Sequence, residues 1–370
     1  MSRMTELHYQ VRFATPAFLG NAQQQAQWRS PPIKSMLRQW WRIVKAPATG
    51  FDHRRLLADE NHLFGSAGGD EAAGRSLIRM RLSDWGPGTL NRVDRGETVT
   101  HPEVSSPVGA NLYLGYGPIG GVDRSAIAAD AGISVNLALR LPDEFVPEVK
   151  AAMQLAHWFG TVGSRSRNGF GSILIQGEGL AGLGDMSLPA LVQIAPLSTL
   201  GNALKRDWPH AIGGEVDPFI WRLFRAVPNA ETGKTDLHGF ARWEDAMREL
   251  ARIKIAVRTS PFFKFGGGGR EGHAEPQARH VLSYPSGNSH AVAGWGNNGR
   301  LANQVRFKVH RRGPRDHVAV IVHLPCALPR HMADQFAGRI PDQPAVWTEV
   351  HRLLDQQRSN GLMRLKGSPA

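Results

Sequence analysis

The spacing of hydrophobic residues divides the first half of the chain into strands and helices. Alternation predicts strands at 7–18, 75–82, 133–141 and 172–176. Recurrence at helical spacing predicts helices at 31–45, 52–63 and 145–159. A stretch rich in Gly, Pro and Asp, residues 84–132, separates the two middle strands as a long insertion.

The resulting order is strand, helical segment, strand, strand, helix, strand. This is the order of a split βαβ unit, so the first half is predicted to be an α+β, ferredoxin-like domain. In the run 75–82, Ile78, Met80 and Leu82 are expected on one face of the strand, and Arg79 and Arg81 on the other.

The second half repeats this theme more loosely. A stretch rich in Gly, Leu and Pro near 177–190 predicts the boundary between the halves. Helical spacing recurs at 243–257 and 344–357, and the glycine-rich residues 259–300 predict a long loop.

Two alternating runs, 304–312 and 317–324, predict a hairpin whose Val305, Phe307 and Val309 face the core. The polar residues between them are predicted to face outward: Arg306, Lys308, His310 and Arg312. The tail 361–370 is predicted to fray.

Composition indicates a class of partner only through charge. The 370 residues carry a formal net charge of +12, which favours a polyanion, either nucleic acid or an anionic membrane surface. No apolar run approaches the roughly 18 residues of a membrane span, and the N-terminus lacks the apolar stretch of a signal peptide, which favours a cytoplasmic protein. The single cysteine, Cys326, excludes an internal disulfide and a multi-cysteine zinc site.

The predicted helix 31–45 has two distinct faces. Six residues form a broad apolar arc: Ile33, Met36, Leu37, Trp40, Trp41 and Val44. Lys34, Arg38, Arg42 and Lys45 form an adjacent basic arc that contains no acidic residue, and Trp41 lies where the arcs meet. An ordinary amphipathic helix with a solvated face is one interpretation. The other is a phosphate-binding stripe beside an indole that stacks on a base.

The segment 160–171 is rich in glycine and combines two serines with two arginines. Its residues are Gly160, Gly163, Ser164, Arg165, Ser166, Arg167, Gly169 and Gly171, among others. Glycines let the backbone approach a ligand, exposed amides can bind anions, and arginine suits phosphate oxygens. A flexible surface loop is the alternative. The segment lacks the Gly-Lys-Ser/Thr of a Walker A loop.

Two further patterns suggest enzymatic alternatives. Gly115, Gly117 and Gly120 match G-x-G-x-x-G, which would indicate nucleotide binding if a βαβ crossover surrounded it. His8 in the first strand and His157 beside the glycine loop are candidate bases for RNA cleavage. No H-x-x-x-H or H-E-x-x-H spacing is found, so no metal site or cofactor is predicted.

Four segments together resemble a known family: Thr15–Asn21, Arg29–Arg42, Leu63–Ser66 and Gly163–Gly171. They are similar to the RAMP superfamily of CRISPR proteins. Within it, the Trp-Trp-Arg helix and the early Thr-Pro-Ala-Phe-Leu-Gly resemble the first subunits of Cmr complexes, the type III-B RNA-silencing effectors. The second half matches only loosely.

The resemblance implies tandem ferredoxin-like (RRM-like) domains, 1–180 with the insertion 84–132 and 190–370 with the long loop 259–300. It implies RNA binding in a cleft beside the glycine loop, with CRISPR RNA (3′ region), target RNA and other RAMP subunits as partners and no membrane. In such assemblies target cleavage belongs to the repeated backbone subunit, so this chain would not be the nuclease.

The leading hypothesis is therefore a non-catalytic RNA-binding subunit of a type III CRISPR effector in antiviral defence. Its predicted RNA contacts are Lys34, Arg38, Trp41, Arg42, Gly163, Ser164, Arg165, Ser166, Arg167 and Gly169. The alternative is a metal-independent RAMP endoribonuclease that processes precursor CRISPR RNA through His8 or His157. A nucleotide-binding enzyme that uses Gly115–Gly120 is the third hypothesis.

Overall fold

The computed structural model describes residues 3–66, 74–129, 132–195, 197–207, 210, 218–267, 272–284, 290–296 and 299–366. These residues form an α+β protein with two antiparallel four-stranded sheets. Among the described residues, none of the helices is both long and apolar enough to cross a bilayer.

The first sheet has the strand order β2-β7-β1-β8. Its strands are β1 (Met4–Phe13), β2 (Arg79–Leu82), β7 (Val135–Pro142) and β8 (Ile173–Gly177). The connecting helices are α1 (Ser30–Lys45), α2 (His53–Phe64) and α4 (Val146–Phe159). The predicted element order is confirmed, and so is the alternation in β2, where Arg79 and Arg81 are exposed and Leu82 is buried.

The insertion contains short elements: β3 (Thr98–Val99), β4 (Val108–Gly109), α3 (Ala110–Gly115), β5 (Tyr116–Gly117) and β6 (Ile119–Gly120). The G-x-G-x-x-G pattern follows the helix α3, and a two-residue parallel ladder joins β5 to β6. The strand–glycine–helix order of a dinucleotide site is therefore absent from the described residues 108–129, and that hypothesis is wrong.

The second sheet has the strand order β12-β13-β9-β14. Its strands are β9 (Ile220–Leu223), β12 (Val305–Gly313), β13 (Asp316–His323) and β14 (Leu362–Arg364). The helices α7 (Trp243–Arg258) and α10 (Gln343–Asp355) connect them, so the element order of the first half recurs. The prediction of a frayed tail is wrong for 362–364, because Leu362 pairs with Leu223 in β9.

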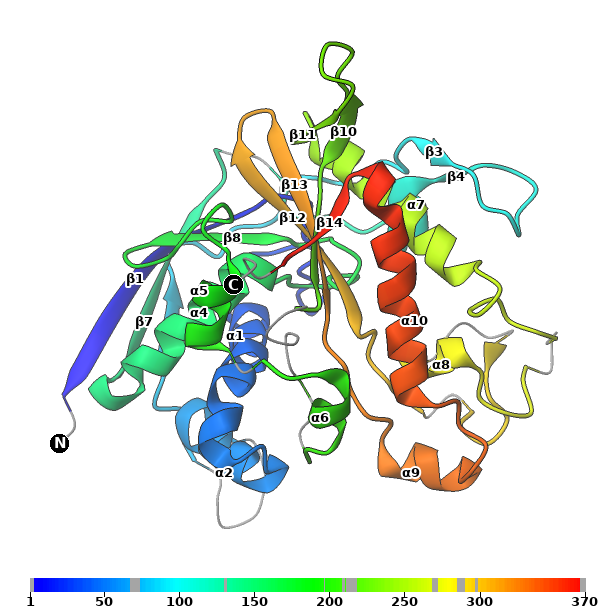
Figure 1. Ribbon diagram of the computed structural model, residues 1–370. Helices are drawn as coiled ribbons and strands as arrows, with labels where there is room; N and C mark the ends of the chain where they lie inside the picture. The colour runs from blue at the N-terminus through cyan, green and yellow to red at the C-terminus, as the bar shows by residue number, and fades with distance from the viewer. Residues whose placement is uncertain are drawn as a thin grey trace.

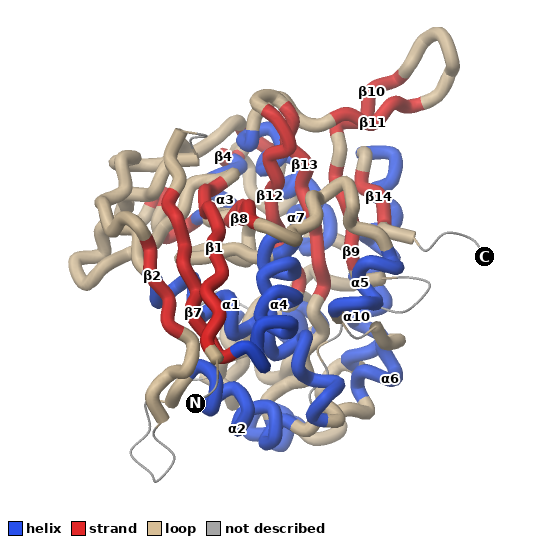
Figure 2. The backbone as a smooth tube through the Cα atoms, turned by 90° about the vertical axis from the view of Figure 1, so that its left-hand side faces the viewer, coloured by secondary structure: helices blue, strands red, loops and turns tan. Residues whose placement is uncertain are grey.

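Smaller elements complete the described chain. A hairpin of β10 (Arg225–Pro228) and β11 (Thr235–His238) projects from the body in Figures 1 and 2. Short helices are α5 (Leu188–Ile194), α6 (Leu200–Leu204), α8 (Ala278–Leu282) and α9 (Arg330–Ala333). Single 3-10 turns are η1 (Ala46–Thr49), η2 (Asp143–Phe145), η4 (Asp334–Phe336) and η5 (Gln356–Asn360). The predicted long loop 259–300 therefore contains α8, while 268–271, 285–289 and 297–298 lie outside the described residues.

The two halves stack as sheet, helices, sheet, helices, which Figure 1 shows from left to right. One hydrophobic core joins the first sheet, α1 and α4 to Val318, Val320 and Val322 on one face of β13. The opposite face of the second sheet, with Phe307 and Val309, packs against α7 and α10. The second sheet is therefore covered on both faces.

This layering corrects the predicted orientation of β12. Lys308 and His310 were expected to face solvent, but they are only 1% and 2% exposed because that face of the strand packs on the end of α4. Lys308 Nζ donates hydrogen bonds to the backbone carbonyls of Ala156, at 3.1 Å, and of His157. His310 Nε2 lies 2.8 Å from the carbonyl oxygen of Trp158. The two side chains thus donate to carbonyls in the last turn of α4, where a helix leaves most carbonyls without a partner of its own.

Candidate nucleic-acid interface

The glycine loop needs its glycines for its path through the protein. Gly163, Gly169 and Gly171 have φ values of 90°, 96° and 63°, a region that side chains disfavour. A Cβ at Gly163 would lie 2.6 Å from the carbonyl oxygen of Phe18, and one at Gly171 would lie 1.9 Å from that of Val162. The loop is therefore folded tightly against its neighbours.

Several amides of this loop already have partners inside the protein, which limits the expected grip on phosphate to the other backbone N–H groups. The amide of Ser164 donates to the Phe18 carbonyl at 3.0 Å, and that of Gly171 donates to the Pro16 carbonyl at 2.8 Å. The amide of Gly169 donates to the Ser166 carbonyl at 3.2 Å. These three groups stabilise the loop and are not available to a ligand.

The arginines of the loop instead contribute to a pocket of about 860 Å³ between the two halves of the chain. Five cationic side chains from three segments line it: Arg165 and Arg167 from the glycine loop, Lys254 and Arg258 from α7, and Arg279 from α8. Ser166 also lines the pocket, and there is no carboxylate among its described lining residues. The pocket is therefore suited to an anion.

Because these side chains are buried, keeping them charged costs free energy unless a counter-ion lies nearby. Burial lowers the pKa of Lys254 well below its ordinary value, and the nearby charges of Arg258 and Arg165 lower it further. Burial, followed by the charge of Arg258, lowers the pKa of Arg279 to about 10. The protein gives Lys254 one neutral acceptor, because its Nζ donates to Asn168 Oδ1 at 2.8 Å. An anionic ligand would supply the missing negative charge.

Three tyrosines also line the pocket. Tyr113 and Tyr116 come from the insertion, and Tyr284 comes from the segment after α8. The ring of Tyr116 is 63% exposed, and Lys254 Nζ lies 5.7 Å from the ring centroid of Tyr113. The buried hydroxyl of Tyr113 has no hydrogen-bond partner among the described residues. The pocket thus offers the exposed ring of Tyr116 and a free polar group next to its cations, which suits a nucleotide.

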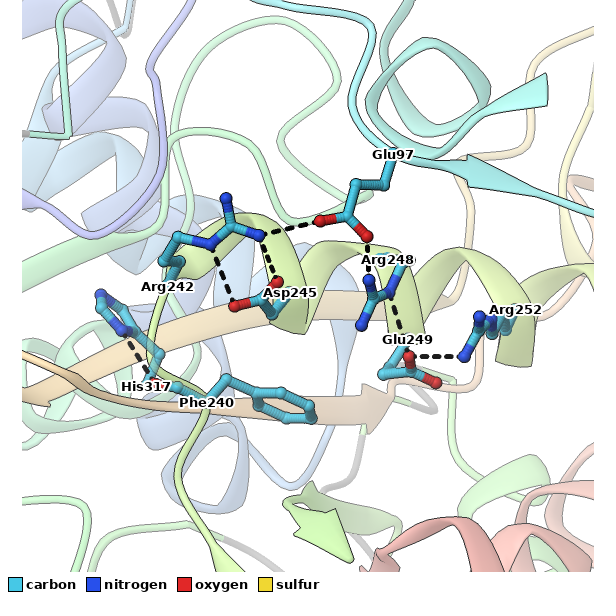
Figure 3. A network of polar contacts seen from close by, with 8 residues as sticks. All are labelled: Glu97, Phe240, Arg242, Asp245, Arg248, Glu249, Arg252 and His317. Atoms are coloured by element: carbon cyan, nitrogen blue, oxygen red, sulfur yellow. Dashed lines mark hydrogen bonds and ion pairs between the residues drawn. The ribbon is translucent and has the colours of Figure 1, made fainter.

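Figure 3 shows how the insertion is held against α7. Glu97, which precedes β3, accepts a hydrogen bond from Arg242 Nη2 at 2.9 Å and another from Arg248. Arg242 also pairs with Asp245, and Arg248 with Glu249, so the network continues along the helix. Hydrogen bonds from Arg242 and Arg248 lower the pKa of the Glu97 carboxyl. The network anchors the segment that carries the two insertion tyrosines.

Comparison with known proteins identifies the family of one part of the chain, the part that contains the glycine loop. Residues 10–174 match the family model described as the RAMP superfamily. This part of the chain belongs to the RAMP superfamily. No curated protein matches the sequence significantly.

Solved structures similar to this chain share little sequence with it. One is the apo form of Cmr1 from Pyrococcus furiosus, with 15% identity, a TM-score of 0.46 and coverage of 98% of this chain and 99% of that one. Another is a chain of the type III-B Cmr-beta complex bound to cognate target RNA and AMPPnP, with 8% identity, a TM-score of 0.47 and coverage of 95% and 99%. A third is a chain of Cmr-beta bound to cognate target RNA, with 8% identity, a TM-score of 0.43 and coverage of 95% and 100%.

The basic face of α1 is neutralised by a residue that the helix itself does not contain. Glu60 of α2 is 1% exposed and accepts hydrogen bonds from Arg38 Nε, at 2.7 Å, and from Arg42 Nη2, at 2.7 Å. Burial raises the pKa of Glu60, but the hydrogen bonds from Arg42 and Arg38 outweigh it and the pKa is lowered. The expectation of an unbalanced basic face is therefore wrong, and RNA contacts by these two arginines stay a prediction.

Trp41 and Lys34 also have internal partners. Trp41 is fully buried, and its Nε1 donates to Glu148 Oε1 at 2.8 Å, so the predicted stacking of this indole on a base is wrong. Lys34 Nζ donates to the Phe64 carbonyl at 3.1 Å and to Ser76 Oγ at 2.8 Å. None of the four predicted α1 residues lines the pocket, which the glycine loop reaches through Arg165, Ser166 and Arg167.

The two candidate catalytic histidines lie apart from the pocket lining. His8 is on the exposed face of β1, where its Nε2 lies 3.4 Å from Glu6 Oε1. His157 Nδ1 accepts a hydrogen bond from the amide of Ile175 at 3.1 Å. Burial, followed by the charges of Lys308 and Arg12, lowers the pKa of His157 to about 3, so this imidazole is neutral at physiological pH.

Sequence reasoning missed half of the pocket. Lys254 and Arg258 follow Met247, Leu250 and Ala251 at the helical spacing of the buried face of α7. Basic residues that take the next positions on the buried face of a helix are unusual, and this pattern could have identified Lys254 and Arg258 from the sequence. Arg279 and the tyrosines lie in segments without periodicity, so only the folded chain brings them to the glycine loop.

Proposed function

We propose that this chain is a non-catalytic RNA-binding subunit of a type III CRISPR effector complex of the Cmr kind. The match of residues 10–174 to the RAMP superfamily supports the class. By the same analogy its partners would be CRISPR RNA, at the 3′ region, target RNA and other RAMP subunits, in the cytoplasm. The names of the similar structures, Cmr1 and Cmr-beta bound to cognate target RNA, agree with that assignment.

The pocket between the halves is the observation that carries this proposal. Five cations and three tyrosines surround about 860 Å³, and the described lining contains no acid. Arginine and lysine bind phosphates without reading sequence, and tyrosine rings accept any base. A subunit that must accept every guide needs this combination of affinity without sequence preference.

The test is a salt series of RNA affinities for Arg165→Ala plus Arg167→Ala. Each lost phosphate contact should reduce the slope of log K against log salt by about 0.7, so the double variant should lose about 1.4. Arg54→Ala plus Arg55→Ala is the matched control, because both arginines are exposed on α2, away from the pocket. Arg258→Ala plus Arg279→Ala should behave like the loop variant.

An unchanged affinity and slope in both pocket variants would refute the assignment of RNA to this pocket. Melting curves of all variants identify any loss that comes from unfolding rather than from missing contacts.

The competing proposal is a metal-independent endoribonuclease. Lys254 is the observation that keeps it open, because it is an amine in the pocket lining whose pKa burial lowers toward the range of a general base. The assay is cleavage of precursor CRISPR RNA in EDTA by the wild type and by the variants His8→Ala, His157→Ala and Lys254→Met. Cleavage that disappears in one of these variants would replace the binding proposal with an enzymatic one.

A further inference from the structure

The first sheet has a face that none of the helices in the described part of the chain covers. Its hydrophobic face packs on α1 and α4, and Figure 2 shows β2, β7 and β1 at the front of the molecule. The register places Arg79, Arg140 and Glu6 opposite one another in one row across β2, β7 and β1. The next row on the same face contains Arg81, Ala138 and His8. We call Arg79, Arg81 and Arg140 the sheet-face arginines.

The sheet-face arginines have no counter-ion among the described residues. All three are exposed, and no ion pair joins any of them to a described carboxylate. Glu6 stands opposite Arg140, but its carboxylate lies against His8, with Oε1 3.4 Å from Nε2.

This arrangement is unfavourable for the isolated protein. Arg79 and Arg140 are direct cross-strand neighbours, and like charges in that relation destabilise a sheet. When like charges lie side by side and nothing in the fold neutralises them, the surface that carries them is a candidate functional site. An anion with regularly spaced charges would relieve the repulsion.

The surface chemistry favours RNA over a protein. Stable protein interfaces have an apolar centre, but none of the large exposed hydrophobic residues belongs to β1, β2, β7 or β8. His8 is the one aromatic side chain at the exposed positions of these strands. What the surface offers is a row of forked donors for phosphate oxygens.

We propose that the sheet-face arginines bind the sugar-phosphate backbone of an RNA strand, at a surface distinct from the pocket. None of the three lines the pocket, so the two surfaces can be tested separately. A strand held at both sites would have a higher overall affinity than either site alone provides.

The experiment uses the full chain with Arg79→Gln, Arg81→Gln and Arg140→Gln combined. The control combines Arg54→Gln, Arg55→Gln and Arg358→Gln, which remove the same charge from other exposed positions. Labelled poly(U) is titrated over a potassium chloride series, with a short oligouridylate as a probe that occupies the pocket alone. Melting curves confirm that each variant folds.

The sheet-face variant should bind poly(U) more weakly than the control, with a salt slope reduced by about 2, from three contacts at about 0.7 each. Its affinity for the short probe should equal that of the control, whereas Arg165→Ala plus Arg167→Ala weakens both probes. Equal poly(U) affinity and slope in the sheet-face and control variants would overturn the inference. Polyglutamate serves as a further probe, for an acidic protein partner. If the sheet-face variant binds RNA unchanged but loses binding of polyglutamate, the inference is also overturned, because that result assigns the surface to an acidic protein.

Discussion

Lys308 provides the most direct test of how the two halves of the chain are joined. Its ammonium group lies between the halves, 1% exposed, and donates to three backbone carbonyls of the first half. Those carbonyls belong to Ala156 and His157, in the last turn of α4, and to Ile173 at the start of β8. Lys308→Met keeps an unbranched side chain, one heavy atom shorter, and removes every side-chain donor.

The expected cost follows from the three lost hydrogen bonds. Each is worth about 1 kcal/mol net, because folding exchanges bonds to water for bonds within the protein. The methionine still fills the space of the aliphatic stem, so little packing is lost. The free energy of unfolding should therefore fall by about 3 kcal/mol.

The assay is urea denaturation at pH 7.5, followed by tryptophan fluorescence. Lys150→Met is the control, because Lys150 lies exposed on α4, the helix whose end Lys308 contacts. The free energy of unfolding of this variant should stay within about 0.5 kcal/mol of that of the wild type. A loss below about 0.5 kcal/mol for Lys308→Met would refute the reasoning, since it would show that the end of α4 does not depend on this side chain.

Three further predictions concern buried polar groups. Glu60→Gln should lower the free energy of unfolding by about 2 kcal/mol at pH 7. Because the two arginines lower the pKa of Glu60, this difference from the wild type should shrink below about pH 4. A difference that stays constant with pH would contradict this prediction. Trp41→Phe should cost about 1 kcal/mol in urea denaturation, by losing the hydrogen bond to Glu148, and should leave RNA affinity unchanged; weaker RNA binding would restore a role for the indole. Burial lowers the pKa of His157 and of His323 to about 3, so in this pH range each histidine binds a proton only in the unfolded chain. Compared with its value well above pH 6.5, the free energy of unfolding should therefore be lower by about 1.4 kcal/mol per histidine at pH 5.5. Equal urea midpoints at pH 8 and pH 5.5 would argue against that linkage.

The fold was predictable wherever a periodic pattern ran for several residues. The strands and helices of the first half follow from such patterns, and so does the alternation that exposes Arg79 and Arg81. Strand β9 and strand β14 were missed, because each has only three or four residues and too few repeats to show a period. Their pairing depends on a partner far away in the chain, such as Leu223 with Leu362.

The candidate site was predictable only in part. The glycine loop was predicted to contact phosphate, which stays a prediction, and the structure places Arg165 and Arg167 in the lining of a cationic pocket. The basic face of α1 was misjudged because Glu60, which balances it, lies on another helix. A pattern within one helix gives no information about the charges that a neighbouring helix brings to it.

The sequence by itself determined the local structure, the positive charge and the resemblance to RAMP proteins, because each depends on residues close together in the chain. The tertiary structure decided which polar faces meet solvent. Alternation in β12 shows two faces of a strand, but it cannot show that a second layer buries Lys308 on one of them. The pocket has the same origin, since its cations come from segments that become neighbours only when the two halves pack together.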